Sequence, residues 1–526
     1  MQAKQYSSLV AFLYFLNNNI SGGLLAVPFV FYHAGLLFGL LLLAVVTALT
    51  IPPLIWTLET MARAQVGGHQ LCTCMMSKED AKNTEIKALE DSGRRMVLES
   101  MPRYDIRSER KFEVDELCRM FLGVKTSLLY GWSVVLWCLL SMWYYVTVAA
   151  SAWAAHIPFS SQQCSDDDFR LMLHPDGPCW NTYTVCVLLF GVVAVPISMM
   201  ELTEQKVIQV GLSLVRLLAV ILMVGYCTIS LFSNQTDEKY DGHEIQQNVW
   251  LRVDLIGGMS VVPVVSHALS CQSLIPSFVQ PVANKRNLHW LLAAAVFTCA
   301  SVYGIVGVTV ASHFKDQLVE TSTLSWVPLM ASSYPVVARM ISYFIVLYPS
   351  LVMLSAMPLS AVACSNYIIS LCQKKSGGEE TKTATRRVIR FCVVVVPLVL
   401  AIFVSNLVVV LTYGGLAGYF STLIIPGLLV MRSRDMCYKV FASKQHKNSA
   451  EKVKTETDNR MDVVVVWDEW KKSKSVCRAQ IVSDITVTPY TSLLSQRVVV
   501  WIILAFSVIT IAITVSSSIN YLRHNT

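Results

Sequence analysis

Long apolar stretches separated by shorter polar segments dominate the sequence. A membrane-spanning helix needs about 20 mostly apolar residues, and about eleven stretches meet this requirement. They cover residues 8–34, 36–61, 128–155, 182–200, 207–232, 254–281, 288–312, 336–372, 388–405, 407–431 and 498–520. The pattern predicts an all-α polytopic membrane protein with about eleven transmembrane helices.

The composition agrees with this pattern. Of the 526 residues, 54% are hydrophobic and only 15% are charged, and the mean hydropathy is +0.52. A soluble protein of this size could not cover so much apolar surface with so few charges, whereas a bilayer solvates that surface directly.

The net charge of +7 indicates orientation rather than a nucleic-acid partner. Most Lys and Arg residues fall between spans on one side, including the short basic segments 285–286, 374–375 and 386–387. Loops rich in Lys and Arg stay in the cytosol. The N-terminus is therefore predicted to be cytosolic, and the C-terminus, after an odd number of spans, external or lumenal.

Two features of the predicted external loops agree with this orientation. Asn234 begins an Asn-Gln-Thr glycosylation sequon just after the fifth span. Cys164 and Cys179 share one external loop and are expected to form a disulfide in an oxidising compartment. No signal peptide is evident, because the first hydrophobic stretch is long enough to be the first span.

Two polar insertions, 62–127 and 432–497, are predicted to be cytosolic and to offer docking sites for cytosolic protein partners. Neither is large or apolar enough for a separate enzyme domain. The other predicted regions are 1–61 with spans one and two, 128–232 with spans three to five, 233–249 as an external loop, 250–372 with spans six to eight, 373–431 with spans nine and ten, and 498–526 with span eleven and the external C-terminus.

Polar residues and glycines interrupt the middle of the first span. They include Asn18, Asn19, Ser21, Gly22 and Gly23. Non-helical backbone survives at that depth only where it lines a cavity or is buried in protein. Freed N–H groups and the positive end of the second half-helix can hold a carboxylate, and freed carbonyls can hold an ammonium or a cation. The alternative is a kink packed against a neighbouring helix.

A second interruption is predicted in the sixth span. Pro263 is followed there by Ser266, His267 and Ser270. The sixth span begins the second half of the protein as the first span begins the first half. Interrupted spans at corresponding positions indicate a substrate site near the membrane midplane, so the polar and glycine residues of both breaks are the candidate substrate-binding residues.

Two ionisable residues fall inside predicted spans. His267 lies about twelve residues from the start of its helix, near mid-membrane, where an imidazole serves a proton or substrate site or stays neutral and structural. Arg216 lies about ten residues beyond Lys206. It is predicted to act in coupling or inner gating, or to pair structurally with Glu201 or Glu204.

Two further residues complete the set of coupling and gating candidates. Glu59, near the inner end of the second span, is an interfacial carboxylate or part of a proton relay, and Ser355 donates an oxygen to a cation or hydrogen-bonds between helices. No catalytic motif, nucleotide-binding loop or metal-ligand spacing is present in the sequence. We therefore expect no enzyme activity, no cofactor and no metal site.

Several short motifs carry a resemblance to a known family. They are Gly22-Gly23 with Pro28 and Ala34-Gly35, the segment 117–123, Leu202-Thr203-Glu204-Gln205, Cys271-Gln272 with Pro276-Ser277, Tyr348-Pro349 with Pro358, and Gly415-Leu416-Ala417-Gly418. Together they resemble the amino acid/auxin permease family of the amino acid–polyamine–cation superfamily. Within it, the chain is most similar to a branch of orphan transmembrane proteins in animals and protists.

The resemblance implies a leucine-transporter-like fold, with two inverted five-helix repeats plus one extra helix. It also implies amino-acid transport coupled to protons or sodium, with the substrate carboxylate held at Ser21 to Gly23. Three departures matter. Ser21 replaces a glycine, Ser355-Ala356 replaces a Ser/Thr-Asn pair and so disfavours sodium, and His267 stands where relatives often carry an aromatic residue.

The sequence therefore favours a secondary active transporter of amino acids or similar small zwitterions, coupled to protons rather than sodium, in the plasma membrane or a lysosomal or vacuolar membrane. The alternative is a non-transporting sensor or scaffold with the same fold, which signals through its cytosolic loops.

Overall fold

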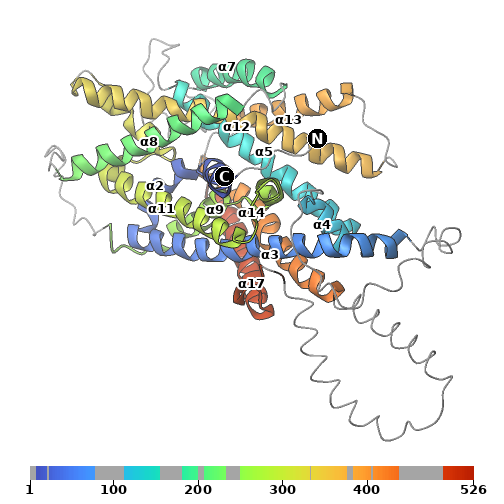
Figure 1. The fold of residues 1–526 in the computed structure, drawn as a ribbon. Helices are drawn as coiled ribbons and strands as arrows, with labels where there is room; N and C mark the ends of the chain where they lie inside the picture. Colours follow the sequence, from blue (N-terminus) through green and yellow to red (C-terminus); the bar gives the residue numbers. More distant parts are fainter. Residues whose placement is uncertain are drawn as a thin grey trace, which may run out of the picture.

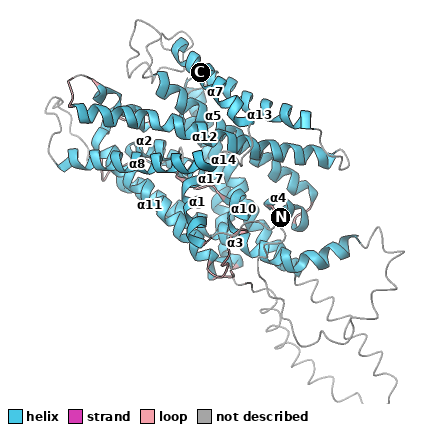
Figure 2. Ribbon diagram, turned by 45° about the horizontal axis from the view of Figure 1, so that its top comes forward, coloured by secondary structure: helices cyan, strands magenta, loops and turns pink. Residues whose placement is uncertain are grey.

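The computed structural model describes residues 7–20, 23–76, 112–154, 180–199, 206–232, 249–331, 333–375, 383–403, 407–437, 488 and 490–525. Within these ranges the backbone forms helices joined by turns and short connections (Figure 2). The prediction of an all-α protein is confirmed.

The first half of the chain contributes α1 (Ser8–Asn19), α2 (Gly23–Ala34), α3 (Leu36–Met76), α4 (Val114–Phe121), α5 (Val124–Ala154), α7 (Trp180–Met199) and α8 (Lys206–Phe232). The second half contributes α9 (Leu255–Ala268), η2 (Gln272–Leu274), α10 (Ile275–Val279), α11 (Leu288–Phe314), η3 (Lys315–Gln317), η4 (Ser322–Met330), α12 (Val336–Lys375), α13 (Thr383–Phe403) and α14 (Leu407–Tyr419). A π-helical turn, η5 (Phe420–Ile424), connects α14 to a helix over residues 425–437, and η6 (Leu493–Ser495) precedes α17 (Arg497–Asn525).

All eleven predicted stretches coincide with helical segments. Within the described ranges, seven helices are long and apolar enough to cross a membrane, and α2 and the start of α17 are shorter apolar helices. The total of eleven spans stays a prediction. The helix of the second stretch is longer than expected: α3 continues past residue 61 to Met76, and its residues 62–64 are fully buried, so packing extends it beyond the apolar run.

Several prolines lie inside long helices of this protein. Pro263 lies inside α9, which continues to Ala268, and Pro349 and Pro358 lie inside α12. A proline removes one backbone hydrogen bond from a helix, but neighbouring helices in a membrane protein can restore the freed carbonyl's contacts. The helix of the sixth span therefore ends after Ala268, within the predicted polar segment that includes Ser266, His267 and Ser270.

The centre of the molecule consists of the short helices α2, α9 and α14, with longer helices around them (Figure 1). α2 packs against α9 and α11, and α14 packs against α9 and α5. The long helices α5 and α12 pack against each other, and α4, whose apolar residues are buried, leads into α5 through the positive-φ residue Gly123. One continuous core joins these helices.

Candidate functional site

The first interruption lies between α1 and α2. α1 ends at Asn19, and the last hydrogen bond of its backbone runs from the N–H of Ile20 to the carbonyl of Leu16 (2.8 Å). The hydroxyl of Tyr303 in α11 donates to the carbonyl of Asn19, which is 2% exposed. α2 begins at Gly23. The break therefore spans three residues, of which the described part includes one.

Three predicted residues of this break are not described fully. Ser21 and Gly22 lie outside the described residues, and Asn18 belongs to the backbone of α1, but its side chain lies outside the described part.

The second interruption follows α9. The backbone leaves the helix after Ala268, and the N–H of Ser270 donates to the carbonyl of His267 (3.2 Å). The next residue, Cys271, donates its N–H to the side-chain oxygen of Gln272 (2.9 Å). Helical structure then resumes with η2 and α10. Local side-chain bonds thus replace part of the helical hydrogen bonding at the break.

The two interruptions meet. A Cβ atom added to Gly23 would lie 2.2 Å from the Cβ atom of Ala268, so the start of α2 touches the end of α9. The Asn19 side chain lies within hydrogen-bonding reach of the Cys271 thiol. Four helix ends therefore converge: the ends of α1 and α9 and the starts of α2 and the η2–α10 segment. Only glycine fits at position 23.

α2 and α9 are also joined at their outer ends. The Arg252 guanidinium donates to the carbonyls of Tyr32 (3.0 Å) and His33 (2.8 Å) at the end of α2. The N–H of Asp254 donates to the carbonyl of Ala34 (3.0 Å). Because the two helices are tied at both ends, we expect them to move as one body.

α14 forms a third wall against α9. Added Cβ atoms would lie 2.7 Å from Nδ1 of His267 at Gly414 and 2.5 Å from the carbonyl oxygen of Pro263 at Gly415. The close approach of the two helices requires glycine at both positions. α14 thus packs against the face of α9 that carries the predicted site residue His267.

The predicted serines of α9 bond within this wall. Ser266 donates to the hydroxyl of Tyr419 at 3.4 Å, and Ser270 donates to the carbonyl of Ser266 at 2.5 Å.

His267 sits in an aromatic pocket. Its ring centroid lies 5.8 Å from that of Trp137 and 5.7 Å from that of Tyr144, both in α5, and it is 6% exposed. Tyr144 belongs to a run of aromatics that stands out in the sequence. Trp137 carries no sequence signal beyond its position seven residues, or two helical turns, before Tyr144.

Arg216 in α8 faces tyrosines from three other helices. Its guanidinium lies in the neighbourhood of Tyr144, Tyr145, Tyr303 and Tyr348. Tyr303 also bonds the first break and Tyr144 contacts His267 beside the second, so Arg216 lies beside groups that reach both breaks. Its predicted partners Glu201 and Glu204 lie outside the described residues.

The remaining predicted residues lie apart from the breaks. Ser355 donates to the carbonyl of Val352 in its own helix (2.8 Å). Glu59 in α3 is fully buried and pairs with Arg63 and Arg434. Asn234, Cys164 and Cys179 lie outside the described residues.

At the centre, the partial charges come mainly from the backbone groups at helix ends. The first N–H groups of α2 carry partial positive charge, and the last carbonyls of α1 and α9 carry partial negative charge. Among these carbonyls, that of Asn19 accepts from the Tyr303 hydroxyl and that of His267 from the Ser270 N–H. The residues that meet there, Gly23, Ala268, Asn19 and Cys271, are uncharged. This arrangement suits a small molecule with one negative and one positive group. Among the described residues, no cluster of His, Cys, Asp or Glu could hold a metal ion.

Comparison with known proteins defines the class. The family described as "Transmembrane amino acid transporter protein" matches residues 4–448. The chain belongs to this family of membrane amino acid transporters, which confirms the resemblance seen in the sequence.

Individual relatives fall in the orphan transmembrane-protein branch, as predicted. The chain is 24% identical to Transmembrane protein 104 of Mus musculus over 461 residues, covering 82% of this chain and 88% of the relative. It is 22% identical to the Transmembrane protein 104 homolog of Drosophila melanogaster, covering 84% and 91%. The solved structure of MhsT in complex with L-phenylalanine matches with a TM-score of 0.49 and 11% identity, covering 82% of this chain and 96% of that one.

Proposed function

We propose that this protein is a secondary active transporter of amino acids or similar small zwitterions, coupled to protons, and that the meeting point of the two breaks holds the substrate. The observation that carries this proposal is the contact between Gly23 and Ala268. Two breaks that pointed away from each other would form no common chamber.

The helix ends suggest how a zwitterion would lie. The substrate carboxylate faces the first N–H groups of α2, and its ammonium group faces the carbonyls that end α1 and α9. Asn18, Asn19, Ser21, Gly22 and Gly23 line the first side. Ser266, His267 and Ser270 line the second side, and His267 packs against Gly414 of α14.

Proton coupling follows from the ionisable groups near the chamber. His267 is the proposed proton site, because an imidazole changes charge between about pH 5 and 8. Arg216 is the proposed gating residue, beside tyrosines that reach both breaks. Glu59 takes part in gating at the inner end. Sodium is the less favoured ion, since the Ser355 hydroxyl already donates within its own helix.

The proposal includes the topology expected from the sequence. Eleven spans form two inverted repeats plus one helix, with a cytosolic N-terminus and an external or lumenal C-terminus. Asn234 is then available for glycosylation, and Cys164 can pair with Cys179. The insertions 62–127 and 432–497 face the cytosol, where protein partners bind.

Uptake of radiolabelled amino acids into proteoliposomes tests the function. We expect uptake of at least one amino acid above empty liposomes, increased by an inward proton gradient and unaffected by replacing sodium with choline. Binding of an amino acid without uptake would favour the alternative, a sensor with the same fold. Absence of both binding and uptake across the panel contradicts the proposal.

His267→Phe tests the coupling role. The phenyl ring keeps the aromatic packing against Trp137 and Tyr144 but cannot take up a proton, so uptake should lose most of its dependence on pH between about pH 5 and 8. The matched control is His33→Phe, at the exposed outer end of α2. An unchanged pH profile in His267→Phe removes this residue from the coupling mechanism.

A further inference from the structure

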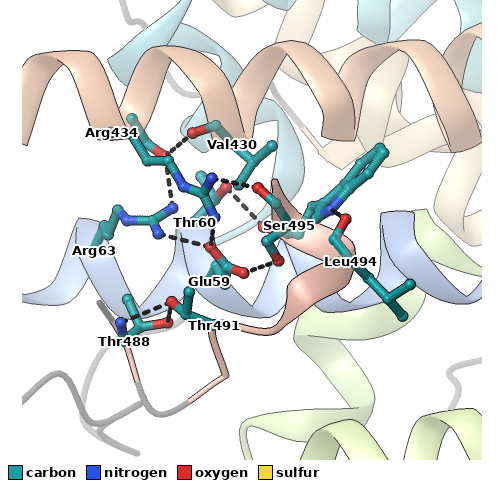
Figure 3. Close-up of polar contacts among 11 residues, drawn as sticks. Glu59, Thr60, Arg63, Val430, Arg434, Thr488, Thr491, Leu494 and Ser495 are labelled. Carbon is teal, nitrogen blue, oxygen red and sulfur yellow. Dashed lines mark hydrogen bonds and ion pairs between the residues drawn. The ribbon is translucent and has the colours of Figure 1, made fainter. Parts of the chain in front are cut away.

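A buried charge network joins the two halves of the protein away from the breaks (Figure 3). Glu59 of α3 accepts a hydrogen bond from Arg63, one turn further along, at 2.6 Å. It accepts a second from Arg434, in the helix over residues 425–437, at 2.9 Å. Ser495 of η6 donates its hydroxyl to the other carboxylate oxygen, and Glu59 is 0% exposed.

The segment before α17 is held to this network by several bonds. We name residues 490–496 the latch. The carbonyl of Ser495 accepts from the Arg434 guanidinium, and the carbonyl of Leu494 accepts from the Trp56 indole N–H (3.1 Å). Near the other end of the latch, the Tyr490 hydroxyl donates to the carbonyl of Lys285, in the connection between α10 and α11 (3.0 Å). The latch therefore contacts α3, residues 425–437 and the connection after α10.

A turn gives the start of the latch a fixed shape. The N–H of Thr488 donates to the Thr491 hydroxyl (2.8 Å), and the N–H of Thr491 donates to the carbonyl of Thr488 (3.0 Å). Ser495 is 1% exposed and Tyr490 is 2% exposed. Tyr490 and Ser495 are thus packed into the protein, whereas Leu494 and Gln496 between and beside them are exposed.

The two arginines of the network differ in how easily they can leave it. Arg63 is 0% exposed and forms a neutral pair with Glu59 in the same helix, and its guanidinium also donates to the Ser433 hydroxyl (3.2 Å). The Arg434 side chain is 17% exposed. If Arg434 moves away, its charge moves toward water and no unpaired ion stays buried, which avoids the large cost of an isolated buried charge. The bond between Glu59 and Arg434 is therefore the exchangeable joint of the network.

We propose that the latch is a conformational lock, which releases Arg434 and Ser495 from Glu59 each time the inner side of the transporter opens. This inference rests on the proposed transport function. Glu59 belongs to the first half of the chain and Arg434 to the second. Alternating access moves one half or bundle against the other around the site, so such motion must stretch or break the bond that joins them.

The latch also connects the lock to a polar region of the chain. It forms the last part of the insertion 432–497 and directly precedes α17. A protein bound to the insertion would therefore change transport by pulling on a segment that already contacts Glu59, Trp56 and Lys285.

Thiol labelling tests the lock without relying on transport. In a Ser495→Cys variant of the full chain, the reaction of position 495 with a maleimide in unsealed membranes is measured by peptide mass spectrometry, which separates it from the native cysteines. The reference is Arg497→Cys, at a position whose side chain is 71% exposed. We expect position 495 to react at least about tenfold more slowly than position 497.

Loss of Arg434 should open the lock. Arg434→Gln added to Ser495→Cys should raise the labelling rate at 495 by about tenfold. Arg434→Lys, which keeps the charge, should raise it less and guards against a folding defect. Arg432→Gln, the same change at an exposed position in the same helix, should leave the rate unchanged. Equal rates at 495 and 497, or no response to Arg434→Gln, would overturn the lock.

Labelling during transport provides a second test of the lock. In proteoliposomes with a proton gradient, a mixture of the protein amino acids should increase labelling at 495 over the same vesicles without amino acids. If the protein shows uptake but the labelling rate at position 495 does not increase, the latch stays bound to Glu59 throughout transport, which contradicts the lock. If no variant shows uptake, the transport function is contradicted instead. The labelling rates at position 495 in Arg434→Gln and Arg432→Gln still decide whether the network holds the latch in place.

Discussion

The centre of the protein and the Glu59 network are held together by different chemistry. At the centre, uncharged residues bring backbones into van der Waals contact, as at Gly23 with Ala268 and at Gly415 with Pro263. In the network, one arginine from the same helix and one from another helix bind a single carboxylate. The first kind of contact depends on size, and the second depends on charge.

This difference suggests a division of labour. Contacts between small residues cannot stretch gradually, because dispersion attraction is lost within about an ångström of separation. Such contacts suit a site whose shape must be kept. Charged groups can exchange a protein partner for water, which suits a joint that opens and closes. In the proposed mechanism, the centre fixes the position of the substrate, and the network sets which state the protein occupies.

The largest effect should come from removing the shared carboxylate. Glu59→Leu leaves Arg63 buried without its ion partner, which costs about 3–5 kcal/mol. We expect a severe loss of thermal stability in detergent, or failure to obtain folded protein. Asp435→Asn, in a pair whose two side chains are 71% and 44% exposed, is the control and should be nearly neutral. Equal melting temperatures for the two variants would mean that the network contributes no more than a surface pair.

A size change at the centre should have the next largest effect. Gly415→Ala places a methyl group 2.5 Å from the backbone oxygen of Pro263, which cannot turn aside as a flexible side chain could. Overpacking of this kind costs about 1–3 kcal/mol.

The control for this prediction is Gly225→Ala in α8, where an added Cβ meets nothing within 4 Å. Thermal unfolding of the purified proteins measures both variants. If Gly415→Ala were as stable as the control, α14 and α9 would not be in the close contact described above.

Removing one hydrogen bond from the network should have a smaller effect. Ser495→Ala deletes the hydroxyl that donates to Glu59 but leaves both ion pairs. A hydrogen bond to a charged group contributes about 1.5–3 kcal/mol, and we expect the low end because the arginines still satisfy the carboxylate. Ser507→Ala, whose hydroxyl bonds the backbone of its own helix, is the matched control. A larger loss for Ser507→Ala than for Ser495→Ala would reverse the expected order.

The smallest effect is predicted for the exposed pair beside the network. Arg497→Gln removes a salt bridge of 2.8 Å to Asp435, but both side chains are open to solvent, so the change should be worth no more than about 1 kcal/mol and should shrink further in high salt. A loss comparable to that of Glu59→Leu would show that exposure does not distinguish these charges.

The sequence predicts the centre better than it predicts the network. Hydropathy alone locates the helical stretches, and runs of Asn, Ser and Gly locate the first break, because such residues are costly in hydrocarbon unless the backbone leaves the helix. The second break is predicted over the segment that contains Pro263, Ser266, His267 and Ser270, and the helix ends within that segment, after Ala268. The sequence does not fix the exact residue, because a proline can be kept inside a packed membrane helix.

The network could be predicted only in part. Glu59 and Arg63 are four residues apart in one helix, a spacing that favours an ion pair. Arg434 and Ser495 lie hundreds of residues away in the chain, and nothing in their local sequence indicates that they share a carboxylate. Arg434 belongs to a basic segment next to a predicted span, and such segments are common on the cytosolic side of membrane proteins. Contacts of this kind become visible only when the helices are placed in three dimensions.

The meeting of the two breaks is tested most directly by a compensating pair of substitutions, with amino-acid uptake into proteoliposomes as the readout. Gly23→Ala adds a methyl group 2.2 Å from the Cβ atom of Ala268 and should abolish most uptake, whereas Gly225→Ala should not. Gly23→Ala combined with Ala268→Gly removes the opposing methyl group and should restore a substantial part of the uptake. Full uptake by Gly23→Ala alone, or no recovery in a folded double variant, would contradict a substrate chamber formed where these two helix ends touch.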